Sequence, residues 1–236
     1  MKNPKNIIVV LLIALVGGST SLITMPANAE PKTLFHERFN DGSADGLTIL
    51  SGAWSVVNKQ LYVSQGTISS FDKIVTESDF PDNIVVTAKT TQISGYSSTG
   101  LLLRYQDAQH YYEIVLDNAA NSNQSLPARG LGIYKVSTNA TQINALGTWQ
   151  QPDIGVPYLH LLGGRFFPFE FHLNQTYTLR VRIMGSTFLV YVDGQLLLAA
   201  TDSDNPYTGG KVGLCSFDTE ATFDDLIVTQ PGSRRK

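Results

Sequence analysis

The chain has 236 residues, a formal net charge of −3 and one cysteine. Its 17 basic side chains form no long run, which argues against a nucleic-acid partner, because phosphate recognition needs a concentrated basic surface. A single cysteine, Cys215, excludes an intrachain disulfide and is expected to lie buried in a strand as a small apolar residue.

The N-terminal residues predict a secretory signal peptide. Lys2 and Lys5 precede the apolar run 7–16, and Ala27-Asn28-Ala29 matches a small-residue cleavage motif. An uncleaved anchor is the alternative, but the run is well short of the about 20 apolar residues that a spanning helix needs. We therefore expect cleavage after Ala29 and a secreted or periplasmic protein without a membrane span.

The chain after residue 30 is dominated by short alternating segments separated by Gly, Asn and Asp turns, and no long amphipathic helix is indicated. Strands are expected, in order, at 34–39, 48–50, 54–57, 61–63, 73–77, 84–91, 100–106, 111–117 and 131–137.

Residues 144–174 interrupt this pattern with six aromatic residues among prolines and glycines: Trp149, Tyr158, Phe166, Phe167, Phe169 and Phe171. Connections of this length are often functional. The aromatics either form a lid over a ligand face or bury themselves as a small separate core. Burial is favoured for the phenylalanines, whereas Trp149 and Tyr158 carry polar groups and are the better binding candidates.

Residues 177–200 predict a three-stranded meander. Apolar residues alternate at 177–183, 188–192 and 196–198, with breaks at Met184-Gly185-Ser186 and Asp193-Gly194. Asp-Gly between alternating segments is a strong hairpin signal, because both turn positions need a positive φ. Two more strands, 211–217 and 222–229, end the chain.

Some dozen short strands with turns between them predict an all-β antiparallel β-sandwich or jelly roll, with an up-and-down barrel as the competing solution. Since no repeat or linker is evident, we expect one domain from about residue 34 to 230.

The order of several short motifs resembles the concanavalin A-like lectin/glucanase superfamily, in particular its laminin-G-like branch. The matching segments are 39–42, 52–57, 100–104, 112–116, 190–194, 211–214 and 223–226. The pair 100–104 and 112–116 is also similar to the 3-keto-disaccharide hydrolase branch, whose members carry a similar arginine and glutamate. The resemblance implies two curved sheets packed face to face, with carbohydrate binding or hydrolysis on the concave side in many relatives.

Glu113 is the candidate catalytic residue. Asp117 shares its strand face but lies about 13 Å away at the usual strand rise. A glycosidase needs its two carboxyl groups roughly 5–9.5 Å apart, so these two do not suffice. The laminarinase-type relatives carry an aspartate two residues after the first glutamate, which this chain lacks. Catalysis would need another carboxylate near Glu113, such as Glu170, and a structural pairing of Glu113 with Arg104 is the alternative.

Carbohydrate binding has a wider set of candidates. Planar guanidinium groups and aromatic rings on one sheet face suit sugar hydroxyls and sugar rings, and an ordinary solvent-exposed face is the alternative. The expected binding residues are Arg104, Tyr111, Glu113, Trp149, Tyr158, Arg180 and Arg182.

Calcium is the candidate metal. Asp41 follows the first strand and Asp224 lies in the last, and these strands are often neighbours in the superfamily, so their oxygens would suit Ca²⁺ as a structural ion. Capping of loops by the same aspartates is the alternative. The four histidines show no spacing for zinc.

Together these features predict a secreted carbohydrate-binding jelly-roll module that recognises a poly- or oligosaccharide. A glycoside hydrolase acting on a disaccharide or glucan is the second hypothesis, and the lack of a complete catalytic set disfavours it. The third is a laminin-G-like module that binds a cell-surface or matrix protein.

Overall fold

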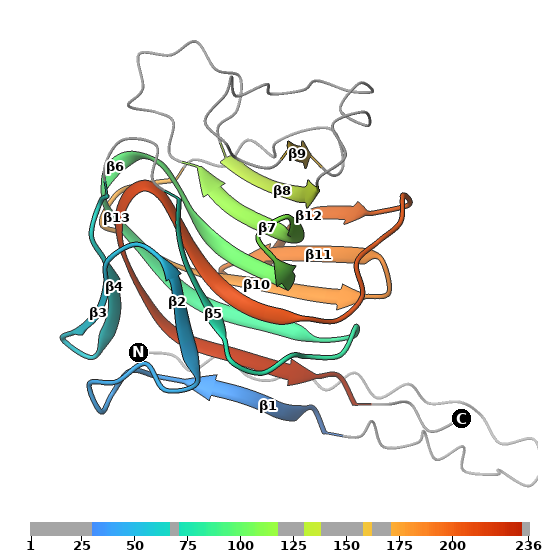
Figure 1. The fold of residues 1–236 in the computed structure, drawn as a ribbon, viewed down its shortest axis with the longest axis horizontal. Helices are drawn as coiled ribbons and strands as arrows, with labels where there is room; N and C mark the ends of the chain where they lie inside the picture. The colour runs from blue at the N-terminus through green and yellow to red at the C-terminus, as the bar shows by residue number, and fades with distance from the viewer. Residues whose placement is uncertain (1–29, 67–70, 118–129, 138–157, 162–170, 233–236) are drawn as a thin grey trace, which may run out of the picture. The chain divides into compact units, whose positions relative to one another are not determined.

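The computed structural model describes residues 30–66, 71–117, 130–137, 158–161 and 171–232. Two long strands, β6 (Val85–Asp107) and β13 (Lys211–Gln230), run side by side through the fold (Figure 1). They pair antiparallel from Lys211 opposite Tyr105 to Thr229 opposite Val85.

Each long strand was predicted from the sequence as two separate strands, and the structure corrects this. Pairing continues through the predicted breaks, with register shifts between Phe217 and Thr219 and between Glu220 and Ala221. Gly95 has a φ of 106° and would place a Cβ 2.4 Å from the carbonyl oxygen of Asp218, so the two backbones approach closely at the bend. The turn-like composition therefore marks a bend inside each strand and not its end.

The two parts of each long strand belong to two halves of one hydrogen-bonded sheet, here named sheet I and sheet II. Sheet I contains β12 (Gln195–Thr201), β11 (Thr187–Val192), β10 (Thr176–Met184), the first part of β6, the last part of β13, β1 (Lys32–Glu37), β4 (Gln60–Val63) and β3 (Trp54–Val57). Sheet II contains β2 (Leu47–Ser51), β5 (Phe71–Thr76), the first part of β13, the last part of β6, β7 (His110–Asp117), β8 (Gly130–Ser137) and β9 (Tyr158–Leu161).

The inward side chains of both sheets form one apolar core. Val181 and Val190 of sheet I and Ile114 and Ile133 of sheet II belong to the same buried cluster. Tyr112 of β7 packs against Phe188 of β11 with 4.7 Å between ring centroids. The predicted all-β antiparallel sandwich is thereby confirmed, and the described residues contain no helix.

The predicted meander and its turns are also found. β10, β11 and β12 pair in sequence, and Asp193 and Gly194 both have positive φ, of 49° and 81°. Asn58-Lys59 forms a similar tight turn between β3 and β4. These turns are predictable because the backbone conformation they need is available to few residue types.

Within the described part of the chain, no helix is long and apolar enough to span a bilayer. The predicted signal peptide lies outside the described residues.

Gly100→Ala is expected to destabilise the fold strongly. A Cβ at this position of β6 would lie 1.9 Å from the carbonyl oxygen of Ile114 on β7, so the two strands would have to separate. Overpacking of this kind costs about 1–3 kcal/mol or more, measured as the free energy of unfolding in urea. Gly42→Ala is the control, because a Cβ there has no neighbour within 4 Å and only its φ of 87° is unfavourable. Equal losses in the two variants would contradict the close approach of β6 and β7.

Candidate functional site

Sheet II carries a second cluster of side chains on the face turned away from the core. Alternate residues of a strand point to opposite faces, so the neighbours of core residues gather here. The cluster comprises Val75, Leu102, Tyr111, Val136 and Cys215, with Phe71 and Tyr105 packed against it. Together with Lys73 and Glu113 these residues define the outer face of sheet II. Cys215 is buried, as the sequence predicted.

Lys73 of β5 lies between aromatic rings on this face. Its Nζ is 4.6 Å from the ring centroid of Phe71 and 5.2 Å from that of Tyr111, whose hydroxyl oxygen accepts a 3.4 Å hydrogen bond from it. Its neighbours in register are small, with Cys215 opposite on β13 and Gly100 next on β6. Burial lowers the pKa of the Lys73 ammonium, and the charges of Glu113 and Cys215 oppose this.

Glu113 of β7 lies in the same group and is only 5% exposed. Its register neighbours are Leu102 on β6 and Tyr134 on β8. Removal from water raises the pKa of its carboxyl group to about 7, against the opposing effect of the Lys73 charge. A carboxyl group that titrates near neutrality is a frequent feature of functional sites.

Partly exposed aromatic rings continue the surface on both sides of Lys73. Phe71 meets Phe217 edge-on at 6.1 Å, and Tyr105 lies 5.4 Å from the Tyr111 ring. Flat apolar rings beside a hydrogen-bonding group suit the mixed apolar and hydroxyl surface of a sugar. The outer face of sheet II thus combines an ammonium, a titratable carboxyl group and accessible rings.

Of the predicted site residues, Tyr111 and Glu113 are brought together on this face, but Arg104 is not. Its side chain is 2% exposed and its guanidinium donates to the backbone carbonyls of Asp82 (2.9 Å), Gly185 (2.5 Å) and Tyr207. The expected Arg104–Glu113 pair therefore does not form. Arg104 instead ties three chain segments together.

A β-bulge explains why the alternation pattern was misleading at Arg104. Leu102 pairs with Gly213 and Tyr105 with Lys211, so Leu103 and Arg104 together oppose one residue of β13. Arg104 also has a φ of 51°. The extra residue turns Arg104 away from the outer face and returns Tyr105 to it.

Arg180 and Arg182 lie on β10 of sheet I, where both are exposed. Arg180 lies 5.6 Å from the ring centroid of Tyr191 on β11. Arg180 and Arg182 therefore lie on the outer face of sheet I and do not share a surface with Glu113, which lies on sheet II. The prediction that all three arginines and Glu113 form one surface is wrong.

Most of the remaining aromatic candidates lie outside the residues that the structure describes. Trp149 lies outside the described residues, as do Glu170 and the phenylalanines at 166, 167 and 169. Tyr158 begins β9, the edge strand of sheet II, where it pairs with Ser137. Phe171 is buried and stacked on Tyr177 with 4.6 Å between centroids, as the burial hypothesis expects.

The predicted calcium ligands are engaged locally. Asp41 accepts hydrogen bonds from the backbone N–H and hydroxyl of Ser43, and these lower its pKa. The backbone N–H of Asp225 donates to Asp224 at 2.8 Å. Across the described ranges, no three acidic, histidine or cysteine side chains converge on a point. The calcium site at Asp41 and Asp224 therefore stays a prediction.

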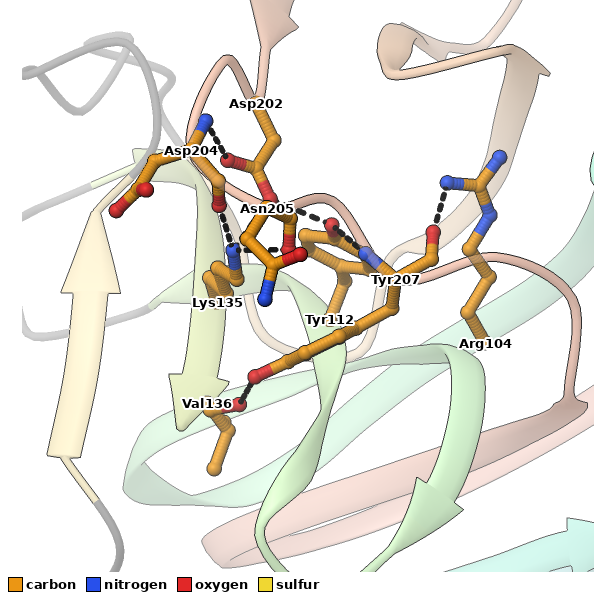
Figure 2. A network of polar contacts seen from close by, with 8 residues as sticks. All are labelled: Arg104, Tyr112, Lys135, Val136, Asp202, Asp204, Asn205 and Tyr207. Carbon is orange, nitrogen blue, oxygen red and sulfur yellow. Dashed lines mark hydrogen bonds and ion pairs between the residues drawn. The ribbon is translucent and has the colours of Figure 1, made fainter. Parts of the chain in front are cut away.

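A second polar cluster lies at the end of the sandwich, where the loop after β12 meets β7 and β8 (Figure 2). The Tyr112 hydroxyl donates to Asp202 at 2.6 Å, and Lys135 Nζ lies 2.8 Å from the same carboxylate oxygen. Lys135 also donates to the carbonyls of Asp204 and Asn205. The Tyr207 hydroxyl donates to the carbonyl of Val136. These contacts satisfy one another and fix the loop, so we regard this cluster as structural.

The fold is the concanavalin A-like jelly roll. A carbohydrate-binding module, CBM66 from Bacillus subtilis, is similar at 18% identity and a TM-score of 0.56, over 77% of this chain and 93% of that one. The exoplasmic/lumenal domain of VIP36, solved with Ca²⁺ and Man3GlcNAc, gives 12% identity and a TM-score of 0.57, over 85% and 90%. SCLam, a non-specific endo-β-1,3(4)-glucanase of family GH16, gives 12% and 0.56, over 89% and 97%. No family model and no curated protein sequence matches the chain.

Glu113→Gln is expected to change how stability depends on pH. The carboxyl group has an ordinary pKa of 4.5 when unfolded and about 7 when folded, so the folded state holds more protons between these values. Its contribution to the free energy of unfolding is fully present below about pH 4.5 and is lost as the pH rises through about 7. Urea denaturation from pH 5 to 8 should show wild-type stability falling by on the order of 2 kcal/mol relative to the variant.

Glu220→Gln is the matched control. Hydrogen bonds from Tyr62 and Ser94 lower the pKa of Glu220 below its ordinary value of 4.5, so its contribution is lost only as the pH falls below about 4.5, and Glu220→Gln should run parallel to the wild type from pH 5 to 8. A pH profile of Glu113→Gln parallel to that of the wild type would contradict the buried position of Glu113.

Asp202→Asn is expected to cost about 3 kcal/mol of unfolding free energy, because it leaves the buried Lys135 ammonium without its carboxylate. Asp225→Asn breaks the partly exposed pair with Lys89 and should cost about 1 kcal/mol or less. Thermal or urea unfolding of both variants gives the comparison. A smaller loss for Asp202→Asn than for Asp225→Asn would contradict the structural role of the cluster in Figure 2.

Proposed function

We propose that this protein is an exported carbohydrate-binding module whose ligand lies on the outer face of sheet II. The observation that carries the proposal is Lys73, held between the rings of Phe71 and Tyr111 beside the buried Glu113. An ammonium that can donate hydrogen bonds next to partly exposed rings is a suitable arrangement for a sugar.

Two further observations support it. The similar solved structures include a carbohydrate-binding module and a lectin-like domain solved with an oligosaccharide, which is consistent with sugar as the partner of this fold. The N-terminal sequence has the layout of a secretory signal, which would take the protein to the periplasm or the medium, where polysaccharides are found.

A glycoside hydrolase is the second candidate, favoured by the pKa of about 7 at Glu113. A carboxyl group of this kind can serve as a general acid. Asp117 is four residues further along the same strand, about 13 Å at the usual rise, which is too far for a partner carboxylate. Release of sugar products that disappears in Glu113→Gln would establish this second function.

Affinity electrophoresis tests the binding proposal. The purified chain is run through gels that hold different polysaccharides, and retardation in at least one gel is expected. Lys73→Met and Phe71→Ala should each weaken that retardation about tenfold, because buried charged and aromatic contacts dominate binding energies. Arg180→Ala and Arg182→Ala on sheet I are the controls and should bind as the wild type does.

Loss of binding in the arginine variants, with Lys73→Met unaffected, would move the site to sheet I and overturn the proposal. No retardation in any gel would exclude polysaccharide binding for that panel. Parallel gels with calcium and with a chelator test the separate calcium prediction. Circular dichroism of each variant distinguishes lost binding from lost folding.

A further inference from the structure

We infer that the outer face of sheet II selects acidic saccharides, with the Lys73 ammonium pairing with a carboxylate of the ligand. The inference rests on the proposed carbohydrate-binding function and adds the class of sugar and the residue that recognises it.

The first argument is that Lys73 has no close counter-charge among the described residues. Among the described residues, no carboxylate lies within 4.0 Å of its Nζ. Its hydrogen bond to the Tyr111 hydroxyl is long, at 3.4 Å, and such a contact is weak. An ammonium has three donors, so donor capacity remains for a ligand.

Lys135, a buried lysine, shows what a structural lysine looks like in this fold. Lys135 Nζ has the Asp202 carboxylate at 2.8 Å and also donates to the carbonyls of Asp204 and Asn205 (Figure 2). Its charge and all its donors are used internally. Lys73 has rings in place of these oxygens, and a desolvated cation without such partners is costly unless something else supplies the negative charge.

The second argument concerns the hydrogen bonding that the Lys73 ammonium would regain from a bound ligand. The Lys73 ammonium has lost part of its hydration, since burial lowers its pKa. A ligand carboxylate would restore a charge-assisted hydrogen bond in a partly water-excluded position, where such bonds are stronger than in bulk water. The hydroxyl groups of a neutral sugar would supply only ordinary hydrogen bonds. The flanking rings of Phe71 and Tyr105 would hold the sugar ring in both cases.

The third argument concerns Glu113, the carboxyl group that competes with such a ligand. The groups that face it are Lys73 from β5, Cys215 from β13, Tyr111 on its own strand and Tyr134 from β8, while β6 supplies the uncharged Leu102. When Glu113 is ionised it offsets the Lys73 charge and repels a second carboxylate. When it is protonated, Lys73 is the only charge of this group. A uronate stays ionised above about pH 5, so acid-sugar binding should strengthen as the pH falls from 8 to 6.

The experiment compares polygalacturonate, alginate and hyaluronan with their methyl esters, in affinity gels at pH 6 and pH 8. Esterification removes the charge and keeps the sugar backbone. We expect retardation by at least one acidic polysaccharide, at least tenfold weaker binding of its ester, and tighter acid binding at pH 6 than at pH 8. Lys73→Met should bind acid and ester equally, whereas Lys73→Arg should keep the preference for the acid. Glu113→Gln should bind the acid equally at both pH values.

The outcomes separate the inference from the proposed function. Equal binding of an acid and its ester by the wild type, or an acid preference that survives in Lys73→Met, overturns the inference and leaves carbohydrate binding intact. Binding only to neutral polysaccharides also overturns it. Retardation by none of the acidic, esterified and neutral polysaccharides overturns the proposed function, and the inference with it.

Discussion

The antiparallel pairing of β6 with β13 is the constraint on which the rest of the structure depends. Because the two strands stay paired through their bends, with register shifts that interrupt the ladder only locally, they carry the chain from one layer of the sandwich to the other. The register of this pair decides which side chains of β5 and β7 share a face. Lys73 and Glu113 approach each other only because Cys215 and Leu102, their register neighbours, lie on adjacent strands between them.

Two lysines of sheet II, Lys73 and Lys135, show how one fold places the same side chain in different roles. Lys135 is surrounded by oxygens and holds a loop, whereas Lys73 is surrounded by rings. The difference follows from position in the sheet. Lys135 lies near the end of the sandwich, where the loop after β12 brings carbonyl groups to it, as Figure 2 shows. Lys135 lies opposite the core residue Tyr112, whereas Lys73 shares the outer face of sheet II with Phe71, so the two ammonium groups lie on opposite faces of the sheet.

Much of the fold could be predicted from the sequence, because turns such as Asp193-Gly194 need residue types that few other positions need. The candidate site was only partly predictable. Tyr111 and Glu113 follow from simple alternation within one strand. Lys73 shares the alternation of Phe71 and Val75, so its position on the outer face could have been found from the same pattern.

The errors arise from features that alternation does not encode. A bulge at Arg104 moves that side chain to the interior, and no residue type in the segment signals it. Arg180 was expected beside Glu113, but its strand β10 pairs with the first part of β6 and so belongs to sheet I. Such pairing between distant strands depends on the whole topology and cannot be read from the local sequence. Local sequence determines which residues of a strand share a face, but it does not determine which strands share a sheet.

The most direct test of the account is a crystal structure of the chain with the oligosaccharide unit of the polysaccharide that it binds best. The account predicts sugar density on the outer face of sheet II, against Phe71 and Tyr105, with a polar group of the ligand at Lys73 Nζ. Density over Arg180 and Tyr191 on sheet I, with the outer face of sheet II empty, would contradict it.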